Sequence, residues 1–437
     1  MSQLALLGGH PVIETSFPHW PIFDQSEIEA VQSVVHSGHW GGTNPVIVTL
    51  ESAFATFQGT RHALAVTNGS QTMEIILRAL GIGPGDEVIV PAYTFIATAT
   101  AVLMTGATPI IVDINADTIT LDPEAFRAAI TPRTKAVMPV HIAGVTGLID
   151  QILTIAREHH IAVIEDCAHA HGAESNGRRT GSLGIAGSFS FQGGKVVTAG
   201  EGGMIVTNDT PLYEKCWSLR EEGRSYSSST PDIRQVGSNY RLTAFQAAIA
   251  QVQLQRFTTQ IPQRLNSIEI LDKGLSQIPG ITPQYRAPKD KAPGYLYLFY
   301  YDSEAFNGLP PHLFMKALQA EGVPCGRSGY PPMHKTPLFQ NRAFGAGGGC
   351  LTQDRKGDYL PDYASLSLPN VERVAREVVC LPHTTLLGTP DQIQGIVEAI
   401  HKIQKQSYTL IRPVNTLVLQ TVIFGQKLSS KLIAARS

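Results

Sequence analysis

The sequence predicts an α/β protein with a mainly parallel sheet that helices cover on both faces, and three observations support this class. Between residues 60 and 210, short apolar runs alternate with helix-like stretches. The strand-like runs are apolar throughout, as in strands that are buried on both faces. The chain has 437 residues, of which 43% are hydrophobic and 16% charged, so it can bury a large core. Ligands are expected at the carboxyl ends of the strands.

Local signals place the elements of this sheet in order along the chain. The turn residues at 83–86 precede one apolar strand. Asp122 and Pro123 suit the N-cap and the first position of a helix. Leu121 and Phe126 fall at the two positions of a hydrophobic staple around it. Strands are predicted at residues 63–67, 87–90, 109–113, 135–141, 161–166 and 204–207, with further helices at 148–158 and 243–255.

After about residue 255 the pattern changes and predicts a second, α+β unit. An aromatic strand is expected at residues 295–301 and a helix at 311–320. Thr389 starts a capping box before another helix. Residues 340–371 contain a glycine-rich tract and are expected to form a mobile excursion. We predict a large unit at residues 15–255, a small unit at 256–410 with residues 1–14 packing near it, and a tail at 411–437 that packs on the body or on a partner chain.

Composition argues against several classes of function. The formal net charge of −2 favours neither a nucleic acid nor an anionic membrane as a partner. No run of eighteen apolar residues occurs, so no transmembrane helix is expected. The first residues lack the pattern of a secretory signal. The five cysteines are scattered without a CxxC pair, which suggests neither a disulfide framework nor a zinc site. We expect a reduced, cytoplasmic enzyme without a metal site.

A carboxylate and a lysine are the candidate catalytic groups. Asp166 ends the apolar strand at 161–166, and Lys195 follows Gly193 and Gly194. A lysine can form a Schiff base with an aldehyde cofactor, and a carboxylate at a strand end can pair with a pyridinium nitrogen. Together they form the apparatus expected for pyridoxal phosphate. The two residues alone leave open a surface lysine and an aspartate that caps a turn.

Longer motifs favour a pyridoxal phosphate site over these alternatives. The chain resembles the DegT/DnrJ/EryC1/StrS family of sugar and cyclitol aminotransferases over about residues 5–410, in the stretches VTNGSQT, VPAYTF, EDCAHAHG, SFSFQGGKVVTAGEGG and GSNYRLTAFQAA. Within that family, FQGGKVVTAGEGG is most similar to the 3-amino-5-hydroxybenzoate synthase subgroup. The resemblance implies fold type I of the pyridoxal phosphate enzymes. Its large domain holds a seven-stranded, mainly parallel sheet, and a smaller α+β domain lies at the C-terminus.

The resemblance also implies roles for the candidate residues near the cofactor ring. Lys195 would hold the cofactor and then move a proton between the substrate Cα and the cofactor C4′. Some relatives have histidine at this position and catalyse dehydration, so the lysine argues against that chemistry. Asp166 would keep the ring nitrogen protonated. His169 would contact or stack near the ring, with a packed core histidine as the alternative. Phe95 would stack on the ring, with Tyr93 as its competitor.

Further residues match a phosphate site and a substrate site. Gly69, Ser70 and Gln71 stand at a helix start, where backbone N–H groups and hydroxyl groups would bind the phosphate, and Ser190 matches a second phosphate ligand. Asn239 matches a residue that reaches the phosphate of the neighbouring subunit, which implies a homodimer with shared active sites. A structural role is equally open for four weaker matches near the substrate, which are Trp40, His141, Tyr330 and His334.

The implied reaction is a transamination. The amino group would pass from glutamine or glutamate, through the pyridoxamine phosphate form of the cofactor, to a keto-sugar, keto-cyclitol or related carbonyl in secondary-metabolite or polysaccharide biosynthesis. Two other functions stay open. One is dehydration with aromatisation, as in the 3-amino-5-hydroxybenzoate synthases, and the other is a non-catalytic regulator that binds the cofactor. The lack of a helix-turn-helix segment and of a basic patch argues against the regulator.

Overall fold

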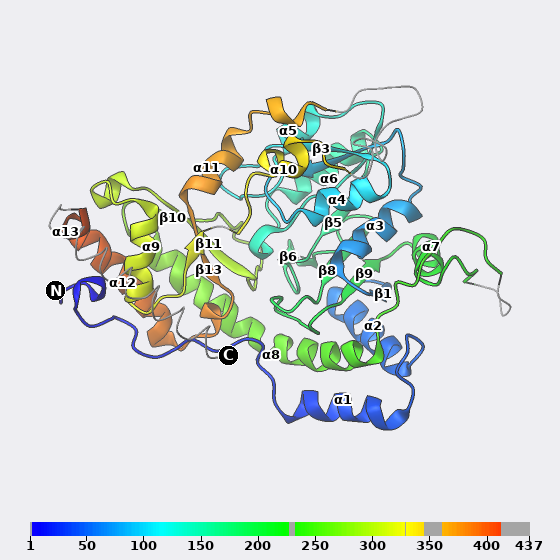
Figure 1. The fold of residues 1–437 in the computed structure, drawn as a ribbon, viewed down its shortest axis with the longest axis horizontal. Coiled ribbons are helices and arrows are strands. Elements are labelled where there is room, and N and C mark those ends of the chain that lie inside the picture. The colour runs from blue at the N-terminus through cyan, green and yellow to red at the C-terminus, as the bar shows by residue number, and fades with distance from the viewer. Residues whose placement is uncertain (1, 227–231, 328, 345–360, 412–437) are drawn as a thin grey trace.

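The structure is a computed structural model that describes residues 2–226, 232–327, 329–344 and 361–411 (Figure 1). Its main feature is a seven-stranded sheet with the strand order β1-β9-β8-β5-β4-β2-β3. The strands are β1 (His62–Val66), β2 (Glu87–Pro91), β3 (Thr108–Val112), β4 (Thr134–Val137), β5 (Ala162–Asp166), β8 (Ala186–Ser190) and β9 (Gly203–Thr207). β9 runs antiparallel to its neighbours β1 and β8, and the other neighbouring pairs are parallel. The predicted mainly parallel sheet is therefore confirmed.

Alternate residues of each strand pack against different helices, as a two-residue period requires. Val88 and Val90 of β2 belong to a core with α3 (Gly69–Ala79), α4 (Ala97–Met104) and α7 (Thr210–Arg220). Ile89, between them, belongs to a core with α5 (Pro123–Ala128) and α6 (Ile149–Glu158) on the opposite face. The sheet is thus covered on both sides, which accounts for its continuously apolar strands.

A second sheet lies in the C-terminal part of the chain. Its strands are antiparallel in the order β10 (Ile281–Pro283), β11 (Leu296–Tyr301), β13 (Val378–Pro382) and β12 (Gly326–Arg327). Apolar side chains such as Phe299 and Leu381 pack with α9 (Pro311–Ala320) and α12 (Pro390–Gln406) in one core. Alternate residues such as Leu298 and Cys380 belong instead to a core of the large sheet. The predicted helix at 311–320 and the capping box at Thr389 are confirmed.

The N-terminal segment packs on this second unit through a buried carboxylate. Glu321 accepts hydrogen bonds from the backbone N–H groups of Ala5 and Val12, at 2.9 and 3.1 Å. Lys402 of α12 pairs with the same carboxylate, 2.9 Å from Oε2. Leu4 and Ile13 are buried in the same core. One side chain therefore fixes both ends of the segment.

The long helix α8 (Ala244–Leu275) joins the two parts of the structure (Figure 1). It begins at a capping box formed by Thr243 and Gln246. Along its length it contacts α1 (Gln25–Ser37), α2 (Pro45–Gln58) and α12. Residue 255, where we expected the large unit to end, lies inside this helix, so the division of the chain there stays a prediction.

Two local expectations need correction. The predicted strand 135–141 ends at Val137, since Pro139 has no N–H group to continue a ladder. The predicted excursion at 340–371 is wrong for residues 361–371, because Tyr363 is fully buried and donates a hydrogen bond to the Pro109 carbonyl at 2.8 Å. Residues 345–360, with the glycine-rich tract, and the tail from residue 412 lie outside the described residues.

The remaining elements are β6 (Glu174–Ser175), β7 (Arg178–Arg179), α10 (Pro337–Gln340), α11 (Pro369–Glu377) and α13 (Tyr408–Ile411), together with short 3-10 turns.

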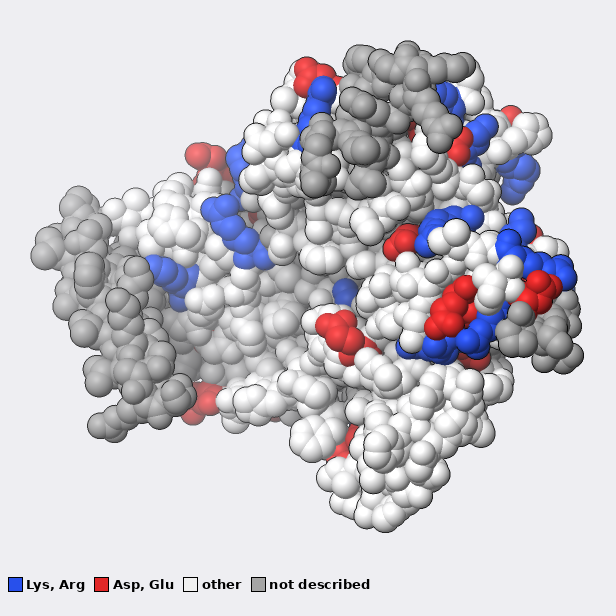
Figure 2. Space-filling view, turned by 45° about the vertical axis from the view of Figure 1, so that its right-hand side comes forward, with Lys and Arg blue, Asp and Glu red and all other residues white. Residues whose placement is uncertain are grey.

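The charged side chains of one face form a mixed patch. Figure 2 shows lysine, arginine, aspartate and glutamate gathered on the side of the molecule where α7 lies, while much of the remaining face carries no charge. Two ion pairs after α7 join Arg241 to Glu221 and Glu222, at 2.9 and 3.1 Å. Among the described helices, none is long and apolar enough to cross a membrane.

Candidate active site

A cavity of about 850 Å³ lies where β1, β5 and β8 end, at the N-terminus of α3. This is the edge of the sheet at which the fold class predicts a ligand site. The second part of the chain closes the cavity with two tyrosines. Nine of the residues singled out in the sequence line it, namely Gly69, Ser70, Gln71, Phe95, Asp166, His169, Ser190, Lys195 and Tyr330.

Lys195 is buried at the wall of the cavity, with 9% of its surface exposed. Its backbone N–H donates to the Gln192 carbonyl in the turn that follows β8. Burial lowers the pKa of Lys195 to about 8, against the opposing effect of the Asp166 charge. An amine with this pKa can give up and regain a proton near neutral pH, as an acid–base group must.

Asp166 is the last residue of β5 and is also buried. Its Oδ2 accepts a hydrogen bond from the Thr98 hydroxyl at 2.8 Å, and its Oδ1 accepts one from the Ala168 N–H at 3.1 Å. Burial raises the pKa of Asp166, while these hydrogen bonds and the charge of Lys195 lower it. The carboxylate is therefore positioned to pair with a cationic group inside the cavity.

The start of α3 can bind an anion. The Asn68 side chain caps the helix by accepting from the Gln71 N–H at 2.9 Å. In the part of the chain that the structure describes, no hydrogen bond engages the N–H groups of Gly69 and Ser70. A Cβ atom on Gly69 would lie 2.8 Å from the Cβ of Ser190, so only glycine lets this hydroxyl approach the helix start. Free N–H groups at the positive end of a helix fit a phosphate.

His169 is held between two tyrosines. Its ring centroid lies 4.1 Å from that of Tyr295, and its Nε2 lies 3.0 Å from the Tyr330 hydroxyl. Its Nδ1 accepts from the Ala143 N–H at 3.4 Å, which places the ring proton on Nε2. Burial lowers the pKa of His169 well below its usual value, so the ring is neutral.

The two aromatic candidates for the cofactor ring have different surroundings. Phe95 is 56% exposed and lines the cavity, whereas Tyr93 is 1% exposed and packs edge-on against Tyr330. The geometry favours Phe95 over Tyr93 for stacking on a ligand.

Three other candidates do not line this cavity. Trp40 donates from Nε1 to the Val35 carbonyl at 3.3 Å, beside α1. His334 is fully buried, with its Nε2 3.6 Å from Glu372 Oε1. A substrate contact by His334 would require it to leave these neighbours, so the geometry of a single chain does not support that prediction. Asn239 is exposed and lies outside the cavity of its own chain.

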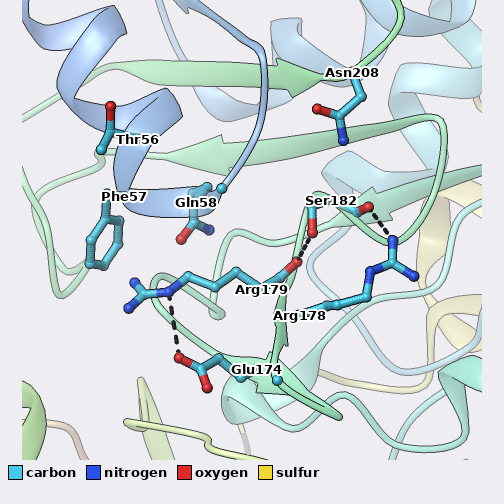
Figure 3. A pocket seen from close by; sticks show the side chains of 10 residues that line it. Thr56, Phe57, Gln58, Glu174, Arg178, Arg179, Ser182 and Asn208 are labelled. Carbon is cyan, nitrogen blue, oxygen red and sulfur yellow. Dashed lines mark hydrogen bonds and ion pairs between the residues drawn. The ribbon is translucent and has the colours of Figure 1, made fainter.

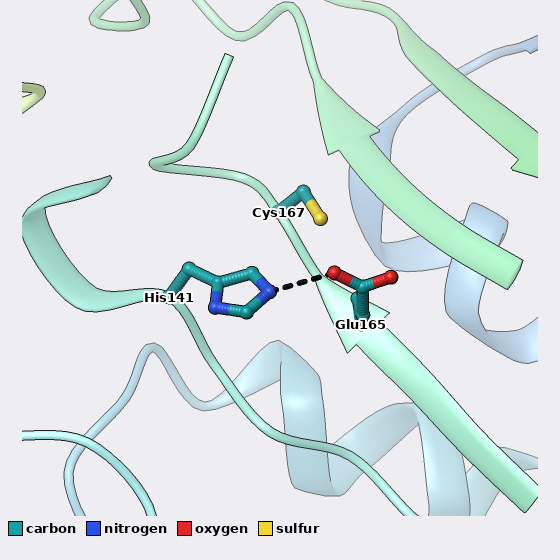
Figure 4. A group of neighbouring side chains, drawn as sticks. All are labelled: His141, Glu165 and Cys167. Atoms are coloured by element: carbon teal, nitrogen blue, oxygen red, sulfur yellow. Dashed lines mark hydrogen bonds and ion pairs between the residues drawn. The ribbon is translucent and has the colours of Figure 1, made fainter. Parts of the chain in front are cut away.

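His141 also lies outside the cavity, in a buried cluster with Glu165 and Cys167 (Figure 4). Its Nε2 is 2.9 Å from Glu165 Oε2. The same carboxylate accepts three backbone N–H groups of the turn at 181–184, at 2.7–2.8 Å. Both carboxylate oxygens are thus already used, and the cluster is better explained as an anchor for that turn than as a metal site. This position favours the structural role that the sequence left open for His141, and its substrate contact stays a prediction.

A second cavity, of about 490 Å³, lies between α2 and the β6–β7 hairpin (Figure 3). Figure 3 shows that the guanidinium groups of Arg178 and Arg179 point in different directions. Arg178 donates to the Ser182 carbonyl at 2.7 Å, and Arg179 lies 3.5 Å from Glu174. These charges already have partners within the protein, and the lining holds neither a lysine nor a histidine. The first cavity is the better candidate for a catalytic site.

Sequence reasoning missed several groups in the first cavity. Tyr295, Gln192 and Glu201 line it, and Thr98 donates a hydrogen bond to Asp166 from outside the cavity. Tyr295 begins the aromatic run at 295–301 that predicts a strand. This run is the sequence feature that could have drawn attention to it. Thr98 carries no local signal, because its role depends on how α4 packs on β5.

Comparisons with known proteins agree with this geometry. The model of the DegT/DnrJ/EryC1/StrS aminotransferase family matches residues 21–401. A relative from Streptoalloteichus tenebrarius, provisionally named L-glutamine:3-amino-2,3-dideoxy-scyllo-inosose aminotransferase, is 38% identical over 92% of this chain and 98% of its own. The L-glutamine:2-deoxy-scyllo-inosose aminotransferase of Micromonospora echinospora is 34% identical, again over 92% and 98%. The crystal structure of a 3-amino-5-hydroxybenzoic acid synthase matches with a TM-score of 0.78 and 33% identity, covering 91% of this chain and all of the other.

Proposed function

Because the chain belongs to the DegT/DnrJ/EryC1/StrS aminotransferase family, we propose that it is a pyridoxal phosphate-dependent enzyme that transfers an amino group from glutamine to a keto-cyclitol. One observation carries the proposal. Lys195, Asp166 and the N–H groups at the start of α3 line a single cavity. These are a basic amine, a buried carboxylate and an anion site, which are the three groups that this cofactor needs.

Each end of the cavity would hold a different part of the cofactor. The N–H groups of Gly69 and Ser70 and the hydroxyl of Ser190 would bind its phosphate. Asp166 would hold the proton on the ring nitrogen, since a buried carboxylate favours an adjacent cation. Phe95 would cover one face of the ring.

Proton transfer is assigned to Lys195. When bound, pyridoxal phosphate supplies an aldehyde that condenses with amines and a ring that withdraws electrons from the adjacent carbon. Lys195 would remove the proton from the Cα of the donor and deliver it to the C4′ position, and then do the reverse with the acceptor. Burial lowers the pKa of its amine to about 8, so little free energy is needed to move the proton either way near neutral pH.

The acceptor is proposed from the two relatives. Both are named for glutamine and for a scyllo-inosose derivative, and both match nearly the whole chain. A second function, dehydration with aromatisation of an amino-dehydroshikimate, is favoured by the match to the 3-amino-5-hydroxybenzoic acid synthase structure.

We also propose that the active site is completed in a homodimer. Asn239 is exposed beside other side chains that a monomer leaves uncovered, with Val236 81% and Ile233 58% exposed. Exposed apolar side chains grouped on one loop are typical of an interface. Asn239 would then reach the phosphate site of the partner.

A product assay tests the function. The purified protein is mixed with pyridoxal phosphate, L-glutamine labelled with ¹⁵N at the α-amino group, and either 2-deoxy-scyllo-inosose or scyllo-inosose. We expect a ¹⁵N-labelled aminocyclitol in the mass spectrum, and none with Lys195→Ala. Labelled glutamate in place of glutamine tests the donor. Formation of 3-amino-5-hydroxybenzoate from the amino-dehydroshikimate, without amination of either ketone, would establish the second function instead.

A further inference from the structure

The amine of Lys195 lies over the face of an aromatic ring from the other part of the structure. Its Nζ is 4.3 Å from the centroid of the Tyr295 ring. Lys195 belongs to the turn after β8 of the large sheet, whereas Tyr295 directly precedes β11 of the second sheet. The contact therefore depends on how the two parts of the structure are assembled.

The Tyr295 ring is fixed by neighbours on two sides. The His169 ring lies 4.1 Å away, and the His383 ring is stacked at 5.9 Å with an interplanar angle of 22°. Trp20 packs edge-on against His383 at 4.4 Å. Trp20 also donates from Nε1 to the carbonyl of Gly193 at 3.0 Å, so the turn that carries Lys195 is held by the same group.

Few other charged groups near Lys195 could bind its ammonium group in place of the Tyr295 ring. The charge of Asp166 favours the charged amine, and no ion pair between the two is found among the described residues. Burial lowers the pKa values of His169, His171 and His383, so these rings are neutral near pH 7 and place no second positive charge beside the lysine. Burial raises the pKa of Tyr295, which keeps its hydroxyl protonated and rules out an ion pair with a phenolate.

We propose that Tyr295 is a positioning residue whose ring face holds the free ammonium group of Lys195 at the cavity wall by a cation–π contact. The negative face of an aromatic ring attracts a cation within about 6 Å, most strongly where water is excluded. The inference rests on the proposed function in that Lys195 must be set free and recaptured during transamination. The Tyr295 ring face beside the amine limits the positions that the released Lys195 side chain can occupy.

The test measures the proton affinity of Lys195 in the full-length chain prepared without cofactor. Competitive labelling with acetic anhydride over a pH series, read by mass spectrometry of the Lys195 peptide, gives its pKa, with exposed Lys135 as the reference in the same digest. Tyr295→Phe keeps the ring and should leave the pKa close to that of the wild type. Tyr295→Leu removes the ring and should lower the pKa by about 0.5–1 pH unit, because the ammonium loses its partner.

A fluorinated series separates the ring face from packing. Phenylalanine carrying one, two or three ring fluorines at position 295 keeps the shape but progressively weakens the negative ring face, so it does not depend on the leucine variant folding. The pKa of Lys195 should fall stepwise along the series. A constant pKa, or a rise in Tyr295→Leu because water enters, would overturn the proposal. The measurement involves no substrate, so this failure would leave the proposed transamination untouched.

Discussion

Thr98 donates a hydrogen bond to Oδ2 of Asp166 at 2.8 Å from a fully buried position in α4. A helix on one face of the sheet thus supports the carboxylate at the end of β5. This hydrogen bond stabilises the ionised form and offsets part of the effect of burial, which raises the pKa of Asp166. Ionisation of Asp166 therefore depends on a residue that does not line the cavity.

Thr98→Ala should shift the pH dependence of cofactor binding. Removing a hydrogen bond that lowers the pKa of Asp166 raises that pKa, so the carboxylate is protonated at higher pH and binding is lost earlier on acidification. Hydrogen bonds to charged groups contribute about 1.5–3 kcal/mol, which corresponds to a shift of about one to two pH units. Fluorescence titration of pyridoxal phosphate between pH 4 and 8 measures it. Thr98→Ser keeps the hydroxyl and should behave like the wild type; identical profiles for all three proteins would contradict the role.

Lys195→Ala should abolish turnover, with a loss of at least about 100-fold, because a positioned acid–base group contributes roughly 10²–10⁴-fold. Borohydride reduction of the wild-type holoenzyme should attach the cofactor to the peptide that contains Lys195, as mass spectrometry of a digest would show. Lys195→Arg retains a positive charge but not the amine and should be equally inactive. Attachment to a different lysine would refute the assignment.

Asp166→Asn should have opposite effects on rate and on stability. A neutral partner no longer favours a protonated ring nitrogen, and the loss of a preorganised charge of this kind costs about 3–4 kcal/mol, or several hundred-fold in rate. Cofactor affinity should fall only to the level that the wild type shows where Asp166 is protonated, because asparagine is neutral at every pH. Near-normal turnover would contradict the role of the carboxylate.

The stability effect follows from the sign of the shift. Burial raises the pKa of Asp166 in the folded chain, so the folded state binds more protons than the unfolded state above about pH 4. The cofactor-free wild type therefore loses stability as the pH rises through this range, and the asparagine variant does not. We expect Asp166→Asn to be more stable by about 0.5–2 kcal/mol at pH 8 and by little at pH 4, as measured by urea unfolding.

Mixing two inactive variants tests the shared site. Lys195→Ala chains and Asn239→Ala chains are first shown to be inactive alone, and are then combined under conditions that exchange subunits. Each mixed dimer has one site with neither lesion and one with both, so about a quarter of wild-type activity should return at random mixing. A fully active monomer in sedimentation, or no recovery despite proven exchange, would count against a site completed by Asn239 of the partner.

Glu321→Gln should loosen the N-terminal segment. The substitution leaves buried Lys402 without its ion-pair partner, and breaking a buried pair in this way costs about 3–5 kcal/mol. Thermal unfolding should occur at lower temperature, and limited proteolysis should cut within the first fifteen residues. Glu158→Gln removes a half-exposed partner of Arg127 and serves as the control, with a much smaller effect. Equal effects of the two substitutions would refute the role of Glu321.

Much of the fold could be predicted because its signals are local. The N-cap at Asp122, the capping box at Thr389 and the apolar strand runs depend on neighbouring residues in the chain, and the structure contains them. The end of β4 also has a local signal, because Pro139 cannot donate a hydrogen bond to a ladder. Tyr363 is different, because its burial against β3 depends on residues far away in the sequence.

The same distinction between local signals and distant contacts holds for the residues of the candidate site. Lys195 and Asp166 stand in sequence motifs, so they could be named before the structure was known. Thr98 and Tyr295 act through contacts between separate elements, and the sequence gives no measure of which helix face meets Asp166 or which strand end meets Lys195. For His141 the sequence left a structural and a substrate role equally open, and only its contact with buried Glu165 favours the structural one.

The continuity of α8 determines how this protein unfolds. At 1.5 Å per residue its 32 residues span about 48 Å, with α1 and α2 packed on one part and α12 on another. Melting either part would strip neighbours from the same helix, so unfolding of one part should destabilise the other. A chain cut after residue 255 would end in the middle of α8 and expose its apolar side. Neither half is therefore expected to persist as an autonomous folding unit.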